Sequence, residues 1–155
     1  MVLYFAYGSN MNWAQMKKRC PSASFFGVAV LPDHRLAFTR KSVKLNCGVA
    51  DAVREVGPKV WGVVYEVADM DLGGLDKSEG YRPGRDKNAY ERRECMVFMD
   101  GDGYKPLTVH TYFASPEENP PFPSHGYKNT IVAGARYWHL PDDYIALLEA
   151  IEVAG

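Results

Sequence analysis

The chain has 155 residues, of which 46% are hydrophobic and 24% charged, and its formal net charge is -1. This length and composition are typical of one water-soluble globular domain, here expected over residues 1–155. The near-neutral charge gives no electrostatic reason to expect a nucleic acid partner, and no apolar run reaches the roughly 20 residues that a membrane span needs.

The N-terminal segment Val2–Ala6 is a short apolar run without the basic residues that begin a signal peptide, and it is typical of a buried strand. The run stops at Gly8-Ser9-Asn10. Apolar residues at helical spacing then predict a short helix over Met11–Arg19, capped by Ser9 or Asn10. Its last residues are basic, which suits the negative end of a helix dipole.

The middle of the chain is rich in strand signals. Residues 24–38 predict two strands joined by a turn at Leu31-Pro32-Asp33. Gly48–Val53 and Val60–Val67 predict two further strands, the second rich in β-branched and aromatic residues. A short helix is expected over Asp69–Leu75, and a charged loop follows it.

The C-terminal half predicts one hairpin, a proline-rich loop and two helices. Helical spacing of apolar residues and a Pro-Asp start support the last helix. The hairpin comprises Tyr90–Phe98 and Leu107–Phe113 around a turn at residues 100–103, the loop covers Ser115–Gly126, and the helices cover Tyr127–Ala135 and Asp142–Ile151. Together the elements predict an α+β fold: a small mixed β-barrel of about five to seven strands with flanking short helices.

The cysteines give no sign of a metal site or a disulfide framework. Cys20, Cys47 and Cys95 are widely spaced, and no CxxC or Cys/His ligand pair occurs. Reduced thiols in a cytoplasmic protein are the simplest interpretation. We therefore expect neither metal nor cofactor.

The segment Tyr7-Gly8-Ser9-Asn10-Met11 is the first candidate for chemistry. An apolar strand that runs through Gly-Ser-Asn into a helix directs backbone N–H groups into one small space, where a carboxylate or phosphate could bind. Gly8 allows the backbone to approach a ligand closely. Taken alone, the same tripeptide is more often an ordinary turn with a helix cap, because such turns are common.

Several segments, in order along nearly the whole chain, resemble the γ-glutamylcyclotransferase-like family. The Tyr-Gly-Ser-Asn-Met segment is similar to the family signature, and Leu75–Gly80 resembles its Leu-Asp-x-x-Glu-Gly element. Further similarities lie in Val60–Val64, Tyr127-Lys128, Gly134-Ala135 and Leu140-Pro141. The family includes γ-glutamylcyclotransferases, AIG2-like proteins and butirosin-type cyclotransferases.

The resemblance implies a small barrel that cyclises a γ-glutamyl group to 5-oxoproline and releases an amino acid or amine. Such an enzyme is an amine-releasing lyase or an acyltransferase, and it acts on a small γ-glutamyl substrate as a monomer or homodimer. Two alternatives stay open: removal of a γ-glutamyl protecting group from a larger biosynthetic intermediate, and a barrel that binds a small metabolite without turnover.

The resemblance also implies a set of site residues. Glu79 matches the family's catalytic glutamate, and a carboxylate at the rim of an apolar barrel should have a raised pKa. The substrate-binding residues implied are Tyr7, Gly8, Ser9, Asn10, Met11, Tyr90, Tyr112 and Tyr127.

Overall fold

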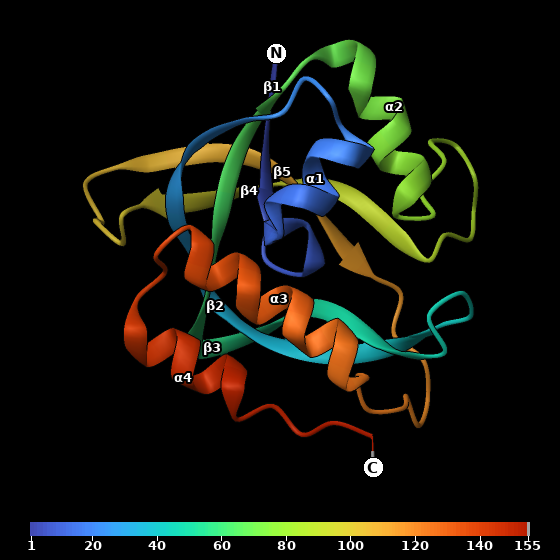
Figure 1. Ribbon diagram of the computed structural model, residues 1–155. Coiled ribbons are helices and arrows are strands. Elements are labelled where there is room, and N and C mark those ends of the chain that lie inside the picture. The colour runs from blue at the N-terminus through green and yellow to red at the C-terminus, as the bar shows by residue number, and fades with distance from the viewer. Residues whose placement is uncertain (155) are drawn as a thin grey trace.

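The computed structural model describes residues 1–154 (Figure 1). Its elements are β1 (Val2–Ala6), a 3₁₀ turn η1 (Ser9–Met11), α1 (Trp13–Arg19), β2 (Ser24–Ser42), β3 (Cys47–Val67), α2 (Asp69–Ser78), β4 (Tyr90–Met99), β5 (Pro106–Ala114), α3 (His125–Tyr137) and α4 (Asp142–Glu149). The strands form a closed barrel in the order β1-β3-β2-β4-β5. Strands β1 and β5 pair in parallel and the other pairs are antiparallel, so the predicted α+β fold with a mixed barrel is confirmed.

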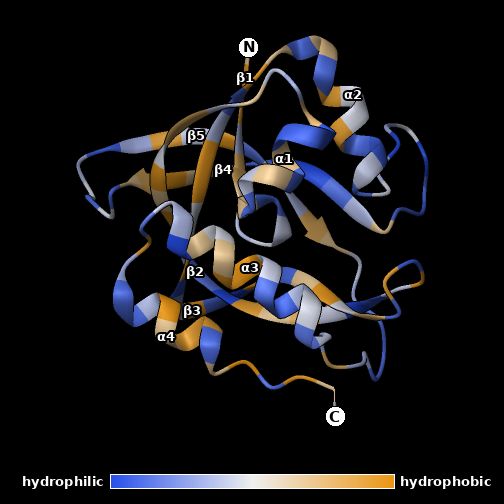
Figure 2. Ribbon diagram, viewed as in Figure 1, coloured by the Kyte–Doolittle hydropathy of each residue, from blue (hydrophilic) through white to orange (hydrophobic). Residues whose placement is uncertain are grey.

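The core lies inside the barrel and between the barrel and the helices. In β3, consecutive residues Val63, Val64 and Tyr65 are all fully buried. Successive strand residues point to opposite faces, so a continuous buried run means that both faces are covered. The Tyr65 ring stacks on Trp13 of α1, and Trp138 packs against it edge-on. In Figure 2, apolar colour follows the strands and hydrophilic colour gathers in the loop after α2.

Strands β2 and β3 are longer than the sequence predicts, because each predicted pair of short strands is one continuous strand. The expected turn at Leu31-Pro32-Asp33 is wrong: Pro32 pairs with Lys59 of β3, and pairing resumes after a bulge. Asp33 is the unpaired residue of this bulge and has a φ of 55°. Its Oδ1 accepts a hydrogen bond from the Gly57 amide at 3.1 Å. A proline and a positive φ therefore mark a bulge here and not a strand end.

All four α-helices differ from the predictions in at least one boundary. The first α-helix begins at Trp13, and its cap is Asn12, whose side chain accepts a hydrogen bond from the Gln15 amide. The prediction of Ser9 or Asn10 as the cap is wrong, because these residues form the separate turn η1. Helix α2 continues to Ser78, and α4 ends at Glu149, two residues earlier than expected.

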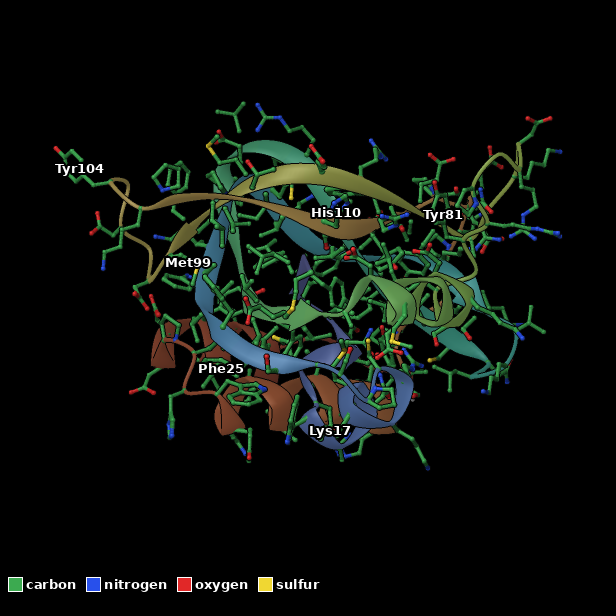
Figure 3. The ribbon with its side chains drawn as sticks, turned by 90° about the horizontal axis from the view of Figure 1, so that it is seen from above. Lys17, Phe25, Tyr81, Met99, Tyr104 and His110 are labelled. Atoms are coloured by element: carbon green, nitrogen blue, oxygen red, sulfur yellow. The ribbon has the colours of Figure 1, made fainter. Side chains whose placement is uncertain are left out.

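The hairpin β4–β5 and the helix α3 agree closely with the predictions. Tyr90 pairs with Ala114 at one end of the hairpin and Phe98 with Pro106 at the other. In Figure 3, Tyr104 marks the tip of this hairpin, and Tyr81, just after α2, lies near its opposite end. Helix α3 crosses the barrel and packs on η1 and on α4 (Figure 1). None of the helices within residues 1–154 has the length and apolarity that a membrane crossing requires.

Candidate active site

The turn η1 follows β1 directly and presents backbone N–H groups at one end of the barrel. Its outer side is fixed by hydrogen bonds to its carbonyls: the Tyr65 hydroxyl donates to Asn10 O at 2.8 Å, and Trp138 Nε1 donates to Met11 O at 3.0 Å. Within residues 1–154, the amide N–H groups of Gly8, Ser9 and Asn10 donate to no protein acceptor. These amides can therefore bind an anion, whereas the α1 dipole contributes little here because α1 starts only at Trp13.

A small pocket with a cavity volume of about 40 Å³, partly open to solvent, lies beside this turn. Five tyrosines dominate its wall, and one carboxylate, that of Glu79, faces it. The lining consists of Tyr4, Tyr7, Gly8, Ser9, Asn10, Ala50, Glu79, Tyr90, Thr111, Tyr112 and Tyr127. The small size of the cavity and its convergent polar groups limit the part of a ligand that it can enclose to a small polar group.

Glu79 caps the C-terminus of α2, which fixes its backbone. Its amide donates to the carbonyls of Leu75 and Asp76, both at 3.1 Å. The side chain is only 17% exposed. Burial raises the pKa of Glu79 to about 7, and Arg19 and Asn10 partly oppose that rise. A carboxyl group that titrates near neutral pH can both accept and donate a proton, as general acid–base catalysis requires.

The Asn10 side chain links the turn to Glu79. Its Nδ2 donates to Glu79 Oε1 and to the Tyr4 hydroxyl, each at 3.0 Å. Its Oδ1 accepts from Gln15 Nε2 and from Arg19 Nη1, also at 3.0 Å. Two donors on Oδ1 fix which end of the amide faces Glu79, so the Asn10 amide holds the carboxylate in one position.

Arg19 is the cation beside Glu79, with Nη1 3.9 Å from Oε1. We expect Arg19→Met to shift the acidic limb of the pH profile of kcat/KM upward by about half a pH unit, the size of a partly exposed ion pair. A higher pKa leaves less Glu79 ionised at pH 6, so activity should fall there and approach the wild-type value at pH 9. Steady-state rates between pH 5 and 9 test this, with Arg19→Lys as the charge-conserving control; an unshifted limb would contradict it.

The tyrosines hold the wall of the pocket together. The Tyr7 hydroxyl donates to Tyr112 O at 2.5 Å, and the Tyr90 hydroxyl donates to Ala50 O. The Tyr127 hydroxyl accepts a hydrogen bond from Ala50 N at 3.1 Å. The pocket-facing backbone of β3 at Ala50 is thus bound by two side chains from other elements.

Tyr112 connects the pocket to α2. Its hydroxyl donates to Asp76 Oδ1 at 2.5 Å, and Arg92 Nε lies 2.9 Å from the same oxygen. Asp76 is only 5% exposed and lies one helical turn before Glu79. The buried Asp76 carboxylate and its arginine partner therefore tie the Glu79 end of α2 to β4 and β5.

The structure brings eight of the nine sequence-predicted site residues into one pocket, although Glu79 is 69 residues from Asn10 in the chain. Met11 is the exception: its side chain is fully buried in the core and does not line the pocket. Met11 follows Asn10 in the turn η1, and its side chain points into the core and away from the pocket that Gly8, Ser9 and Asn10 line. In Figure 3, Tyr81 marks the end of the barrel where this site lies.

Sequence reasoning missed Tyr4, Ala50 and Thr111 in the lining, and Arg19 beside it. The Tyr4 hydroxyl is the one polar side-chain group in the apolar run Val2–Ala6. This hydroxyl could have indicated a site residue, but a tyrosine in an apolar strand is also typical of an ordinary core. In the part of the chain that the structure describes, no three His, Cys, Asp or Glu side chains are grouped to hold a metal ion.

Comparisons with known proteins agree with the geometry. The AIG2-like family matches residues 59–148. A human γ-glutamylcyclotransferase is 38% identical over 154 residues, covering 97% of this chain and 78% of the human protein, and a bovine one is 37% identical over the same coverage. A solved γ-glutamyl cyclotransferase structure superposes with a TM-score of 0.89 at 35% identity, covering 99% of this chain and 89% of that one. The chain belongs to the γ-glutamylcyclotransferase family.

Proposed function

We propose that the protein cyclises the γ-glutamyl group of a small conjugate to 5-oxoproline and releases an amino acid or amine. The observation that carries the proposal is one pocket that combines Glu79, whose pKa is about 7, with the amides of Gly8, Ser9 and Asn10. The relatives named γ-glutamylcyclotransferase support the same reaction. In this proposal the enzyme is an amine-releasing lyase.

The substrate itself supplies the nucleophile. Its α-amino nitrogen forms a bond to the γ-carbonyl carbon, and the bond from that carbon to the leaving nitrogen breaks. The α-ammonium nitrogen loses two protons as it becomes the lactam N–H; Glu79 takes them in turn and delivers them to the leaving nitrogen, which departs as an ammonium group, so no water and no cofactor is consumed. Intramolecular attack in a held conformer can provide an effective molarity of about 10⁵ M or more.

The α-carboxylate is proposed to bind at the Gly8–Asn10 amides with help from Tyr127. A Cβ at Gly8 would lie 3.8 Å from the Tyr127 hydroxyl, so this hydroxyl is close to the turn.

The three cysteines are free thiols, which supports the expectation of a cytoplasmic protein.

For Tyr127→Phe we expect KM to rise about tenfold or more while kcat stays within a few-fold of wild type. The hydroxyl would contact the carboxylate equally in ground and transition states, and a hydrogen bond to a charged group contributes about 1.5–3 kcal/mol. Initial rates over a range of substrate concentrations separate the two constants. A fall in kcat at unchanged KM would contradict this role.

A panel of γ-glutamyl amino acids and γ-glutamyl amines, with 5-oxoproline followed by mass spectrometry, tests the proposed function. Formation of 5-oxoproline and free amine in equal amounts from any member supports it and identifies the leaving-group class. Panel members with large leaving groups test for the deprotection of a biosynthetic intermediate. Binding of panel members without turnover would contradict the proposal in favour of a binding protein.

A further inference from the structure

The hydroxyl protons of the pocket tyrosines are not equivalent. A tyrosine hydroxyl has one proton to donate and lone pairs to accept with. Tyr7, Tyr90 and Tyr112 each donate that proton to a protein oxygen, namely Tyr112 O, Ala50 O and Asp76 Oδ1. Their protons are therefore already used within the protein, and these three hydroxyls can only accept from a ligand.

The hydroxyls of Tyr4 and Tyr127 instead accept hydrogen bonds from the protein. The Tyr4 hydroxyl accepts from Asn10 Nδ2 at 3.0 Å, and the Tyr127 hydroxyl accepts from Ala50 N at 3.1 Å. Within residues 1–154, the Tyr4 hydroxyl donates to no protein acceptor in return, whereas the Tyr127 hydroxyl also has the Ser9 side chain as a hydrogen-bonding neighbour. Tyr4 lines the pocket, so a ligand there is the natural acceptor for its proton.

Tyr4 is the deeper of the two and carries no charge at working pH. It is only 4% exposed, and burial raises the pKa of its hydroxyl well above the usual value, with the nearby Glu79 acting in the same direction. A buried hydroxyl with an unused proton is costly unless something in the pocket accepts it.

The position of Tyr4 indicates which ligand atom it meets. Asn10 Nδ2 is 3.0 Å from both the Tyr4 hydroxyl and Glu79 Oε1, so these two oxygens are neighbours on one amide group. Glu79 must reach the two nitrogens on either side of the γ-carbonyl carbon. The γ-carbonyl oxygen is bonded to that same carbon, so it lies on the Glu79 side of the pocket, where Tyr4 is. The α-carboxylate of the substrate lies at the other side, near Tyr127 and the turn at Gly8.

Resting on the proposed function, we infer that Tyr4 is a catalytic residue that donates its hydroxyl proton in a hydrogen bond to the γ-carbonyl oxygen. As the α-amino nitrogen adds to the γ-carbon, the π electrons of the carbonyl move onto this oxygen, and the Tyr4 hydrogen bond stabilises the resulting oxyanion. When the bond to the leaving nitrogen breaks, the electrons return to form the lactam carbonyl. Tyr4 keeps its proton throughout, while Glu79 transfers protons from the α-nitrogen to the leaving nitrogen.

Tyr4→Phe removes this donor and keeps the ring that packs against Tyr65 and Tyr112. We expect kcat to fall about 10²- to 10³-fold, the range for loss of one oxyanion donor, with KM within about twofold of wild type. Tyr144→Phe is the matched control, because it deletes a buried tyrosine hydroxyl of α4 that does not line the pocket. Its kcat should equal that of wild type.

Binding of an unreactive analogue separates a catalytic role from a structural one. N-glutaryl-alanine has the carboxylate and the γ-amide but lacks the α-amino group, so it cannot cyclise. Calorimetry should show Tyr4→Phe binding it within about twofold of wild type and Tyr127→Phe binding it about tenfold more weakly.

Three results would overturn the inference. If kcat of Tyr4→Phe stays within about threefold of wild type, Tyr4 does not stabilise the oxyanion, although the proposed function stands. The same conclusion follows if analogue binding falls as much as kcat. If the wild-type protein forms no 5-oxoproline from any panel member, the proposed function fails and this inference fails with it.

Discussion

Glu79→Gln is expected to lower kcat for 5-oxoproline formation by about 10²- to 10⁴-fold, the range for loss of a general acid–base group. Glutamine keeps the size of Glu79 and can still accept the Asn10 hydrogen bond through its amide oxygen. It cannot take the proton from the α-ammonium group or give one to the leaving nitrogen. The measurement is kcat on the best panel substrate, and activity within tenfold of wild type would contradict the role of Glu79.

Thermal unfolding at two pH values shows whether Glu79→Gln stays folded. The folded-state pKa of Glu79, about 7, lies above its ordinary value of 4.5, so its contribution to stability is present below pH 4.5 and is lost as the pH rises through 7. A neutral glutamine avoids that loss. At pH 8 the variant should therefore unfold at a higher temperature than wild type, with a free energy of unfolding larger by up to about 3 kcal/mol. Near pH 4 the two proteins should unfold at similar temperatures.

Gly134→Ala should lower kcat/KM about a hundredfold and destabilise the fold by about 1–3 kcal/mol. A Cβ at Gly134 would lie 2.4 Å from Met11 C and 2.6 Å from Asn12 N, both backbone atoms that directly follow the Gly8–Asn10 amides. Helix α3 must move away or displace the turn, and overpacking of this kind costs more than alanine gains in helix propensity, about 1 kcal/mol. A displacement of about 1 Å in a site can cost a hundredfold in rate.

The matched control for this prediction is Gly73→Ala in α2. Nothing lies within 4 Å of a Cβ at that helical position, so the variant should be as stable as wild type or more stable, by up to about 1 kcal/mol. Urea unfolding and kcat/KM of the two variants give the comparison. If Gly134→Ala behaves like Gly73→Ala in both, the close approach of α3 does not position the turn.

Contiguous motifs were the part of the site that the sequence could predict. The turn residues Tyr7–Asn10 are neighbours in the chain, and Glu79 lies in a second short motif, so family resemblance identified both. Met11 belongs to the same motif, yet its side chain lies in the core, because a motif does not reveal which of its side chains point away from a pocket. Tyr4 and Arg19 were missed because their importance comes from hydrogen bonds and distances across the fold, notably through Asn10.

The fold was predictable at the level of its class and less so in its long strands. Helix α3 and the hairpin β4–β5 depend on local signals such as the Ser124 cap and the turn at residues 100–103, and their predicted bounds lie within two residues of the observed ones. The junctions within β2 and β3 carry the same local signals as turns, with Pro32 and Gly57 as examples. Only pairing between the two strands converts those signals into a bulge, and pairing is a tertiary property.

Turnover of a γ-glutamyl amino acid in water enriched in ¹⁸O tests the central claim most directly. Intramolecular attack by the α-amino group takes no oxygen from water, so we expect 5-oxoproline of unlabelled mass and one equivalent of free amino acid. Hydrolysis would instead place one ¹⁸O atom in the γ-carboxylate of glutamate. Labelled glutamate as the first product, with no 5-oxoproline, would contradict intramolecular cyclisation and leave the pocket as that of a hydrolase.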